Sequence, residues 1–240
     1  MTASSRVLEV GAGLGALTVA LAQTGAEVVA VERDPRLIPA LDEVVGSFPR
    51  VRIVAQDALT ADWRSLLRGR PWVVVANLPY NVAVPVVMGL LESEPRVSRL
   101  VVMVQREVGE RLCAGPGHPQ FGAVSLRVAY RAEAHVIRRV PPSVFWPRPN
   151  VESVLVSMAR RPPPVKVDQA ALWRTIEVSF QQRRKTMRGA MIRLGLDSGR
   201  AEEALRQCGI RASQRPEELG LAEFACLAER WRALAPKAPP

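Results

Sequence analysis

Short apolar runs alternate with longer stretches of mixed polarity through most of the chain. The runs are rich in β-branched residues, as buried strands are, and the stretches between them place apolar residues at the three-and-four spacing of an amphipathic helix. The runs are RVLEV (6–10), EVVAVE (27–32), VRIVAQ (51–56), WVVVANL (72–78) and RLVVMVQ (99–105). Strands that alternate with helices predict an α/β fold, in which a parallel sheet carries helices on both faces.

The last two predicted strands lie at residues 134–140 and 151–159, and only ten residues separate them. A parallel crossover needs a helix between its strands, and this connection is too short to hold one. We therefore expect an antiparallel hairpin at one edge of an otherwise parallel sheet.

A proline run at residues 162–164 divides the chain. Three consecutive prolines remove backbone donors and fix φ, so neither a strand nor a helix interior continues through them. Beyond the run, helical periodicity covers residues 168–195, 198–209 and 215–234. We expect an α/β domain over residues 1–162 and a small helical domain over residues 163–240.

The formal net charge of +10 narrows the class of partner. A strongly basic protein favours a polyanion, either nucleic acid or an anionic membrane surface. A coding bias toward arginine is an alternative cause, because only three of the 33 basic residues are lysines. No apolar run approaches the roughly 20 residues that span a bilayer, and the N-terminus lacks a secretory pattern. We expect a cytoplasmic protein without a membrane partner.

The three cysteines, Cys113, Cys208 and Cys226, are odd in number and have no metal-ligand spacing. In a cytoplasmic protein this pattern disfavours both a disulfide and a zinc site. We expect three reduced thiols and no metal.

Three glycines, Gly11, Gly13 and Gly15, follow the first predicted strand and open a predicted helix. Such a turn lets a cofactor approach the backbone closely. Glu32 ends the second strand, where a carboxylate can accept hydrogen bonds from both ribose hydroxyls of an adenosine, and Asp57 ends the third, where it can hold the adenine amine. NAD and S-adenosylmethionine both suit this pattern. Two alternative interpretations remain: the glycine turn only packs the helix on the strand, and Asp57 only caps a helix.

The tetrapeptide Asn77-Leu78-Pro79-Tyr80 follows the fourth strand. The N6 amine of adenine is a poor nucleophile, because its lone pair is delocalised into the ring. Hydrogen bonds from its two protons to the Asn77 side-chain oxygen and the Leu78 carbonyl favour a pyramidal, reactive nitrogen. Pro79 stiffens the loop and Tyr80 can stack on the base. A dehydrogenase needs a general base instead, and the chain has two histidines and no Tyr-x-x-x-Lys.

These residues belong to segments that resemble, over nearly the whole chain, the ribosomal RNA adenine N6-dimethyltransferase family. The matching segments, in chain order, are VLEVGAGLGALT, VVAVERD, VAQDAL, NLPYNVAVPVVMGLL, MVQREVGERLCAGPGHPQFGAVSL, PPSVFWPRPNVESVLV and FQQRRKTMRGAM. The resemblance implies a seven-stranded Rossmann-like methyltransferase sheet with a helical C-terminal domain. It also implies S-adenosyl-L-methionine as cofactor and ribosomal RNA, in the small subunit or its precursor, as partner of a monomeric enzyme that dimethylates two adjacent adenosines.

The resemblance also assigns site residues. The catalytic loop runs from Asn77 to Tyr80, and Phe145 forms a second stacking face for the base, with simple core packing of Phe145 as the alternative. The implied cofactor contacts are Glu9, Gly11, Gly13, Glu32, Asp57, Ala58 and Asn77.

The family carries a Gly-Gln-x-Phe-Leu segment before the first strand that covers the cofactor, whereas this sequence starts close to that strand. Three explanations are considered: a start codon assigned too far downstream, a truncated chain, or a cofactor site that is open on one side. Two other functions are considered: a large-subunit methyltransferase of the erythromycin-resistance type, and a non-catalytic RNA-binding assembly factor on the same fold. The segment PGHPQFGAVSL and the tail PEELGLAEFACLAERW favour the small-subunit enzyme.

A basic cluster falls in the predicted helix 168–195. The segment from Arg160 to Arg193 contains nine basic residues and only two acidic ones. We expect residues of this cluster to share one helix face and dock RNA phosphates, with a merely solvated helix face as the alternative. The predicted RNA-binding residues are Arg183, Arg184, Lys185 and Arg188.

Overall fold

The computed structural model describes residues 1–69 and 71–234, which form two compact units. Unit 1 joins Met1–Cys113 to Arg131–Arg161, and unit 2 joins Ala114–Tyr130 to the chain from Pro162 onward. The chain divides between Arg161 and Pro162, one residue from the expected boundary. Residues 114–130, expected in the first domain, belong instead to unit 2, because Phe121, Leu126 and Tyr130 are buried among its helices.

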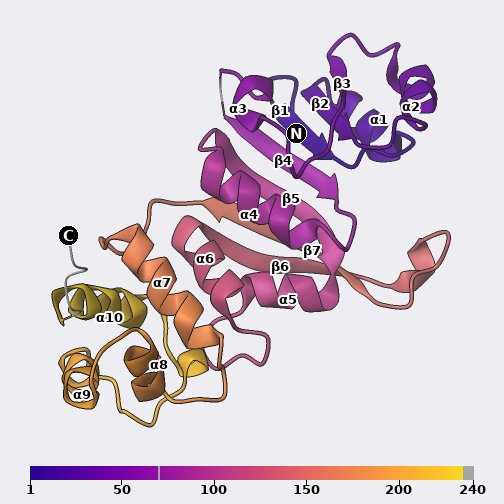
Figure 1. The fold of residues 1–240 in the computed structure, drawn as a ribbon. Helices are drawn as coiled ribbons and strands as arrows, with labels where there is room; N and C mark the ends of the chain where they lie inside the picture. The colour runs from indigo at the N-terminus through magenta and orange to yellow at the C-terminus, as the bar shows by residue number, and fades with distance from the viewer. Residues whose placement is uncertain (70, 235–240) are drawn as a thin grey trace. The chain divides into compact units, whose positions relative to one another are not determined.

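Unit 1 is built on one seven-stranded sheet, drawn in Figure 1, with the order β3-β2-β1-β4-β5-β7-β6. Neighbours from β3 to β5 are parallel, whereas β7 runs antiparallel to both β5 and β6. The strands are β1 (Arg6–Val10), β2 (Glu27–Glu32), β3 (Val51–Ala55), β4 (Trp72–Asn77), β5 (Val97–Gln105), β6 (Ala132–Val140) and β7 (Ser153–Arg160). The predicted seven-stranded sheet and its antiparallel edge hairpin are confirmed.

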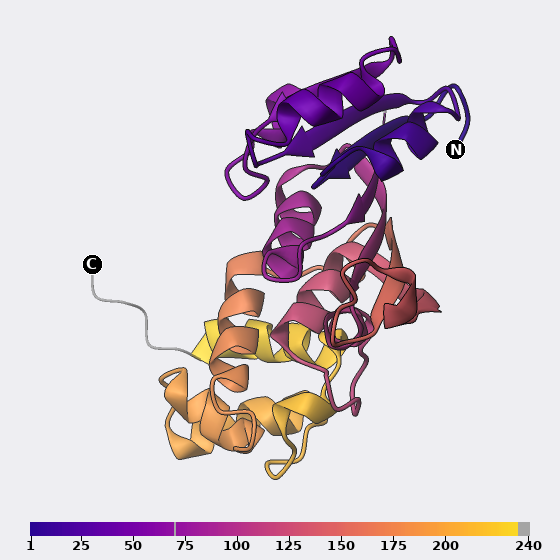
Figure 2. The ribbon, with the colours of Figure 1, turned by 90° about the vertical axis from the view of Figure 1, so that its right-hand side faces the viewer.

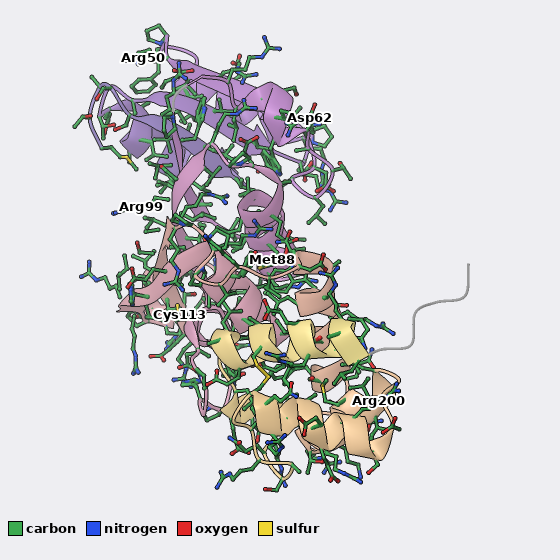
Figure 3. All side chains as sticks on the ribbon, turned by 90° about the vertical axis from the view of Figure 1, so that its left-hand side faces the viewer. Arg50, Asp62, Met88, Arg99, Cys113 and Arg200 are labelled. Carbon is green, nitrogen blue, oxygen red and sulfur yellow. A yellow bond between two sulfur atoms is a disulfide. The ribbon has the colours of Figure 1, made fainter. Side chains whose placement is uncertain are left out.

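Both faces of this sheet are covered. Val28 and Val29, successive residues that point to opposite faces of β2, are both buried. Leu21 packs with Val28 and Leu41 packs with Ala30, so the two helices that carry these leucines lie on one face. The helices of unit 1 are α1 (Ala16–Ala22), α2 (Ile38–Val45), α3 (Trp63–Leu66), α4 (Ala83–Ser93) and α5 (Arg106–Cys113), with a 3₁₀ turn at Pro142–Val144. Asp62, labelled in Figure 3, caps α3 by accepting hydrogen bonds from two backbone N–H groups.

Unit 2 is helical and has its own core. Its elements are α6 (Ala123–Arg131), whose last residue belongs to unit 1, α7 (Gln169–Phe180), α8 (Met187–Arg193), α9 (Ser198–Gln207), a 3₁₀ turn at Pro216–Glu218 and α10 (Leu221–Leu234). Figures 1 and 2 show α7, in orange, beside α10, in yellow. Leu172 of α7 and Phe224 of α10 are fully buried there.

The helix predicted over residues 168–195 is two helices. Residues 181–186 form a turn between α7 and α8. Thr186 has an extended backbone, and its hydroxyl accepts a hydrogen bond from the Gly189 N–H group, as an N-cap does. The cap makes Thr186 the start of a new helix.

The expectation of three reduced cysteines is wrong. A disulfide, drawn in yellow in Figure 3, joins Cys208 after α9 to Cys226 in α10, with a Cα–Cα distance of 5.8 Å. The pairing depends on how two helices pack, so the sequence spacing carries no sign of it. Cys113 is free, and burial raises the pKa of its thiol to about 11.

Over residues 1–69 and 71–234, no helix is long and apolar enough to cross a membrane. Within the same ranges, no cluster of three metal-ligating side chains was found.

Candidate functional site

The glycine turn follows β1 and has three left-handed residues, with φ of +77° at Gly11, +57° at Gly13 and +87° at Gly15. A side chain at Gly15 would come within 2.9 Å of the Leu41 side chain, whereas one at Gly13 would meet nothing within 4 Å. Gly15 therefore serves the packing of α1 on α2. Gly13 leaves open space beside the backbone, as a bound ligand requires.

Glu32 at the end of β2 holds the turn in place. Its two carboxylate oxygens accept hydrogen bonds at 2.8 Å from the N–H groups of Gly13 and Asp34. Asp57, beyond β3, accepts one at 2.9 Å from the Leu59 N–H group and lies 3.3 Å from the Arg33 guanidinium. Each carboxylate keeps lone pairs for a further donor.

A cavity of about 310 Å³ opens at this edge of the sheet, and we call it the turn cavity. Among the predicted cofactor residues it is lined by Gly11, Gly13, Glu32, Asp57 and Ala58, but not by Glu9 or Asn77. Pro79, predicted for the catalytic loop, also lines it. The sequence reasoning missed the other lining residues, which are Val10, Val31, Arg33, Gln56, Asn81 and Val82.

Glu9 lies in β1, just before the glycine turn, and is 1% exposed. Burial raises the pKa of its carboxyl to about 7. The Glu32 carboxylate adds to the shift, and the Thr18 hydroxyl acts in the opposite direction. Among the residues that the structure describes, none donates a hydrogen bond to the Glu9 Oε2 atom. Glu9 is therefore a buried acid that can gain a partner, and its predicted contact with cofactor stays a prediction.

A second, more open cavity of about 350 Å³ lies at the catalytic loop, and we call it the loop cavity. It brings Phe145 together with Asn77, Leu78 and Tyr80, although 65 positions separate Tyr80 from Phe145 in the sequence. Its remaining lining residues are Pro79, Pro147 and Pro149. Core packing of Phe145, the alternative considered above, does not describe a half-buried ring that lines a cavity.

The two cavities meet at Pro79, which lines both. A side chain at Gly11 would come within 3.5 Å of the Pro79 ring and 3.7 Å of the Asn77 carbonyl oxygen, so the glycine turn and the catalytic loop approach closely. The Tyr80 hydroxyl lies 3.1 Å from the hydroxyl of Ser153, which is fully buried. That contact fixes the Tyr80 ring at the wall of the loop cavity.

The predicted basic cluster is not one helix face. Arg183, Arg184 and Lys185 lie in the turn between α7 and α8, while Arg188 lies in α8. Arg183 pairs with Glu217 at 2.7 Å, and Arg188 pairs with Glu202 at 2.7 Å. Within the predicted cluster, Arg184 and Lys185 have exposed side chains that can contact an RNA phosphate.

The arrangement suits group transfer between two ligands. One cavity carries carboxylates that accept hydrogen bonds from hydroxyl and amine groups, and the other carries two aromatic rings beside an amide and a backbone carbonyl. The turn cavity opens at the carboxyl ends of β1 and β2 and the loop cavity at that of β4, and because Pro79 lines both, ligands in the two cavities would be neighbours.

The sheet order, the glycine turn and the acids at the strand ends define a Rossmann-like methyltransferase fold. Two solved structures share that fold. A dimethyladenosine transferase from Plasmodium falciparum matches with a TM-score of 0.78 at 21% identity, covering 95% of this chain and 90% of that one. The 23S rRNA methyltransferase ErmE matches with a TM-score of 0.73 at 24% identity, covering 97% and 93%.

Sequence comparison then gives the family. The pattern of the ribosomal RNA adenine dimethylase family matches residues 1–231, and this chain belongs to that family. The ribosomal RNA small subunit methyltransferase A of Thermobifida fusca is 44% identical over 229 residues, which cover 93% of this chain and 79% of that protein. The protein of the same name from Moorella thermoacetica is 41% identical over 232 residues, covering 92% and 81%.

Proposed function

We propose that this protein is an S-adenosylmethionine-dependent methyltransferase that dimethylates the N6 amine of two adjacent adenosines in small-subunit ribosomal RNA. One observation carries the proposal: the loop from Asn77 to Tyr80 and the ring of Phe145 line one cavity, which adjoins the turn cavity at Pro79. The relatives named ribosomal RNA small subunit methyltransferase A support the choice of substrate. Such an enzyme acts in the cytoplasm, where small subunits are assembled, and works as a monomer.

The residues of the turn cavity fit S-adenosylmethionine. The cavity volume of about 310 Å³ lies at the lower end of the range for small-ligand sites. Glu32 retains lone pairs for the ribose hydroxyls and Asp57 for the adenine amine, and Glu9 comes two positions before Gly11 in the sequence. When bound, the cofactor supplies an electrophilic methyl group on its sulfonium.

The residues of the loop cavity do the remaining work. Tyr80 and Phe145 hold the extruded adenine between two aromatic faces. The Asn77 side-chain oxygen and the Leu78 carbonyl accept the two N6 hydrogens, which directs the nitrogen lone pair toward the turn cavity. No general base is required, because the nitrogen loses its proton after it has gained positive charge.

Methyl transfer from labelled S-adenosylmethionine to immature small subunits tests the proposal. We expect transfer by the parent protein and a loss of about 100-fold or more in Asn77→Ala, as when one transition-state partner is removed. The matched control is Gln23→Ala, which removes an exposed amide side chain that lines neither cavity.

Near-parental transfer by Asn77→Ala would refute the role of Asn77. Transfer to large-subunit RNA alone would identify the erythromycin-resistance type of activity. RNA binding without any transfer would identify a non-catalytic assembly factor. Size-exclusion chromatography of the purified protein tests the monomer.

A further inference from the structure

The connection between β6 and β7 projects beyond the sheet in Figure 1 and carries an exposed tryptophan. The Trp146 side chain is 98% exposed. The other four tryptophans, Trp63, Trp72, Trp173 and Trp231, are buried or half-buried. A tryptophan can bury some 150–250 Å² of surface, so an exposed ring of this size on a projecting loop suits a partner.

Phe145 and its neighbour Trp146 lie in different environments. The Phe145 ring is half-buried, whereas the Trp146 side chain is almost fully exposed. Phe145 lines the loop cavity, whereas Trp146 does not. A base stacked on Trp146 is therefore not the base held in the cavity. Because the two rings belong to adjacent residues, the base on Trp146 lies near the base in the cavity.

The charge around Trp146 favours a polyanionic partner. Residues 134–151 contain no acid and three arginines, Arg138, Arg139 and Arg148, all of them exposed. Exposed apolar side chains, Ile137 at 55% and Val144 at 63%, lie in the same segment. A second protein chain would match the apolar surface alone. Single-stranded RNA matches both features, because it offers phosphates to the arginines and base faces to the ring.

We propose that Trp146 stacks on an unpaired nucleotide that flanks the target adenosine, while Arg148 contacts the adjoining phosphate. The proposal rests on the proposed function for the identity of the target base. The loop then positions the RNA by two rings: Phe145 holds the adenine to be methylated, and Trp146 holds its neighbour. It follows that the enzyme requires unpaired RNA beside its target and rejects a duplex there.

Two measurements test this. The first is the affinity of cofactor-free protein for a single-stranded oligoribonucleotide with two adjacent adenosines and for the same sequence as a duplex, followed by tryptophan emission. The second is the KM for immature small subunits. The variants are Trp146→Ala, Trp146→Phe and Arg148→Ala. Their controls are Val44→Ala, an exposed apolar residue on α2, and Arg99→Ala, an exposed arginine near the opposite end of β5, labelled in Figure 3.

We expect the single strand to quench emission in the parent but not in Trp146→Phe, and the duplex to quench in neither. Trp146→Ala should bind the oligoribonucleotide about tenfold more weakly and have a KM about tenfold higher. Trp146→Phe should have an affinity and a KM close to those of the parent. Arg148→Ala should reduce the salt dependence of binding by about one unit of slope. The two controls should bind like the parent.

Equal affinity and KM in parent and Trp146→Ala would overturn the proposal. Emission from Trp146 that changes with protein concentration and not with RNA would identify a second copy of the chain as the occupant, and would overturn it too. If the parent transfers no methyl group, the proposed function fails, and the oligoribonucleotide measurement alone still decides whether Trp146 stacks on RNA.

Discussion

The buried carboxyl of Glu9 makes stability depend on pH. Its pKa is raised from 4.5 to about 7 by burial, so between these values the folded state keeps a proton that the unfolded state has lost. Stability therefore falls as pH rises through this window, and the whole penalty is present above pH 7. We expect Glu9→Gln, which cannot ionise, to be more stable than the parent at pH 8 by up to about 3 kcal/mol, and equally stable near pH 4.

Urea unfolding across the pH range measures this difference, with Glu43→Gln, an exposed glutamate on α2, as the control. Parallel pH profiles for the parent and Glu9→Gln would show that Glu9 is not the titrating group. The same variant should also bind S-adenosylmethionine more weakly if the Glu9 Oε2 atom gains a partner in the complex.

Single residues of the site could be predicted from the sequence where a motif specifies both the residue type and its position. Glu32 and Asp57 follow strands, and parallel strands end at the same edge of a sheet, so their convergence could be predicted. Arg33, Gln56 and Asn81 could not be predicted in the same way, because the lining of a cavity depends on how loops approach each other. Glu9 is the opposite case: the sequence motif gives its position, but nothing in the sequence predicts that its carboxyl is buried.

At the scale of elements, the strand pattern predicted well because most strands, namely β1, β2, β4, β5 and β7, carry buried valines, whereas β3 and β6 are mostly half-buried or exposed. The helix pattern over residues 168–195 predicted one helix where there are two. Residues 181–186 are all polar, but Phe180 and Met187 on either side keep a seven-residue spacing that one continuous helix would also show, and the backbone at Thr186 reveals the break. Arg160 is a second example: it was counted with the basic cluster, yet its guanidinium points at the end of α4.

Arg160 closes the C-terminus of α4. Its guanidinium donates to the carbonyl oxygens of Val97 at 2.7 Å, Leu91 at 3.0 Å, Leu90 at 3.1 Å and Glu94 at 2.9 Å. Helix-end carbonyls without partners are costly when buried. We expect Arg160→Ala to lower the free energy of unfolding by about 3 kcal/mol and Arg160→Lys by less, measured by urea titration. A loss no larger than that of Arg99→Ala would contradict the capping role.

The turn between α7 and α8 is the part of the cluster that can dock RNA. Arg184 and Lys185 are exposed, whereas Arg183 is held by Glu217 and by the Pro119 carbonyl, both at 2.7 Å. We expect the double variant Arg184→Ala and Lys185→Ala to flatten the salt dependence of RNA binding by about two units of slope and to leave the affinity for S-adenosylmethionine unchanged. Binding of parent and double variant is measured against salt. Equal slopes would place the docking surface elsewhere.

At the scale of the whole molecule, each unit has its own core, and the proline run marks one boundary between them. The second boundary, between Cys113 and Ala114, has no such mark in the sequence. Residues 114–130 belong to unit 2 because of long-range packing, for example the Phe121 ring against Phe180 at 6.0 Å and Tyr130 against Trp173 at 5.0 Å. Contacts between residues so far apart in the chain leave no periodic signal, and the Cys208–Cys226 disulfide escaped prediction for the same reason.

Ligand and reductant should act on different units. S-adenosylmethionine binds the folded turn cavity, so it should slow hydrogen exchange at the glycine turn and raise the melting temperature. NAD, the control ligand, should do neither.

Reducing the Cys208–Cys226 disulfide, which spans 18 residues, should lower stability by up to about 3 kcal/mol and speed exchange in α9 and α10. Cys208→Ser should match the reduced parent, and Cys113→Ser should respond to reductant like the parent. Unchanged exchange in α9 and α10 after reduction would show that helix packing alone holds them together. Protection by NAD would overturn the choice of cofactor.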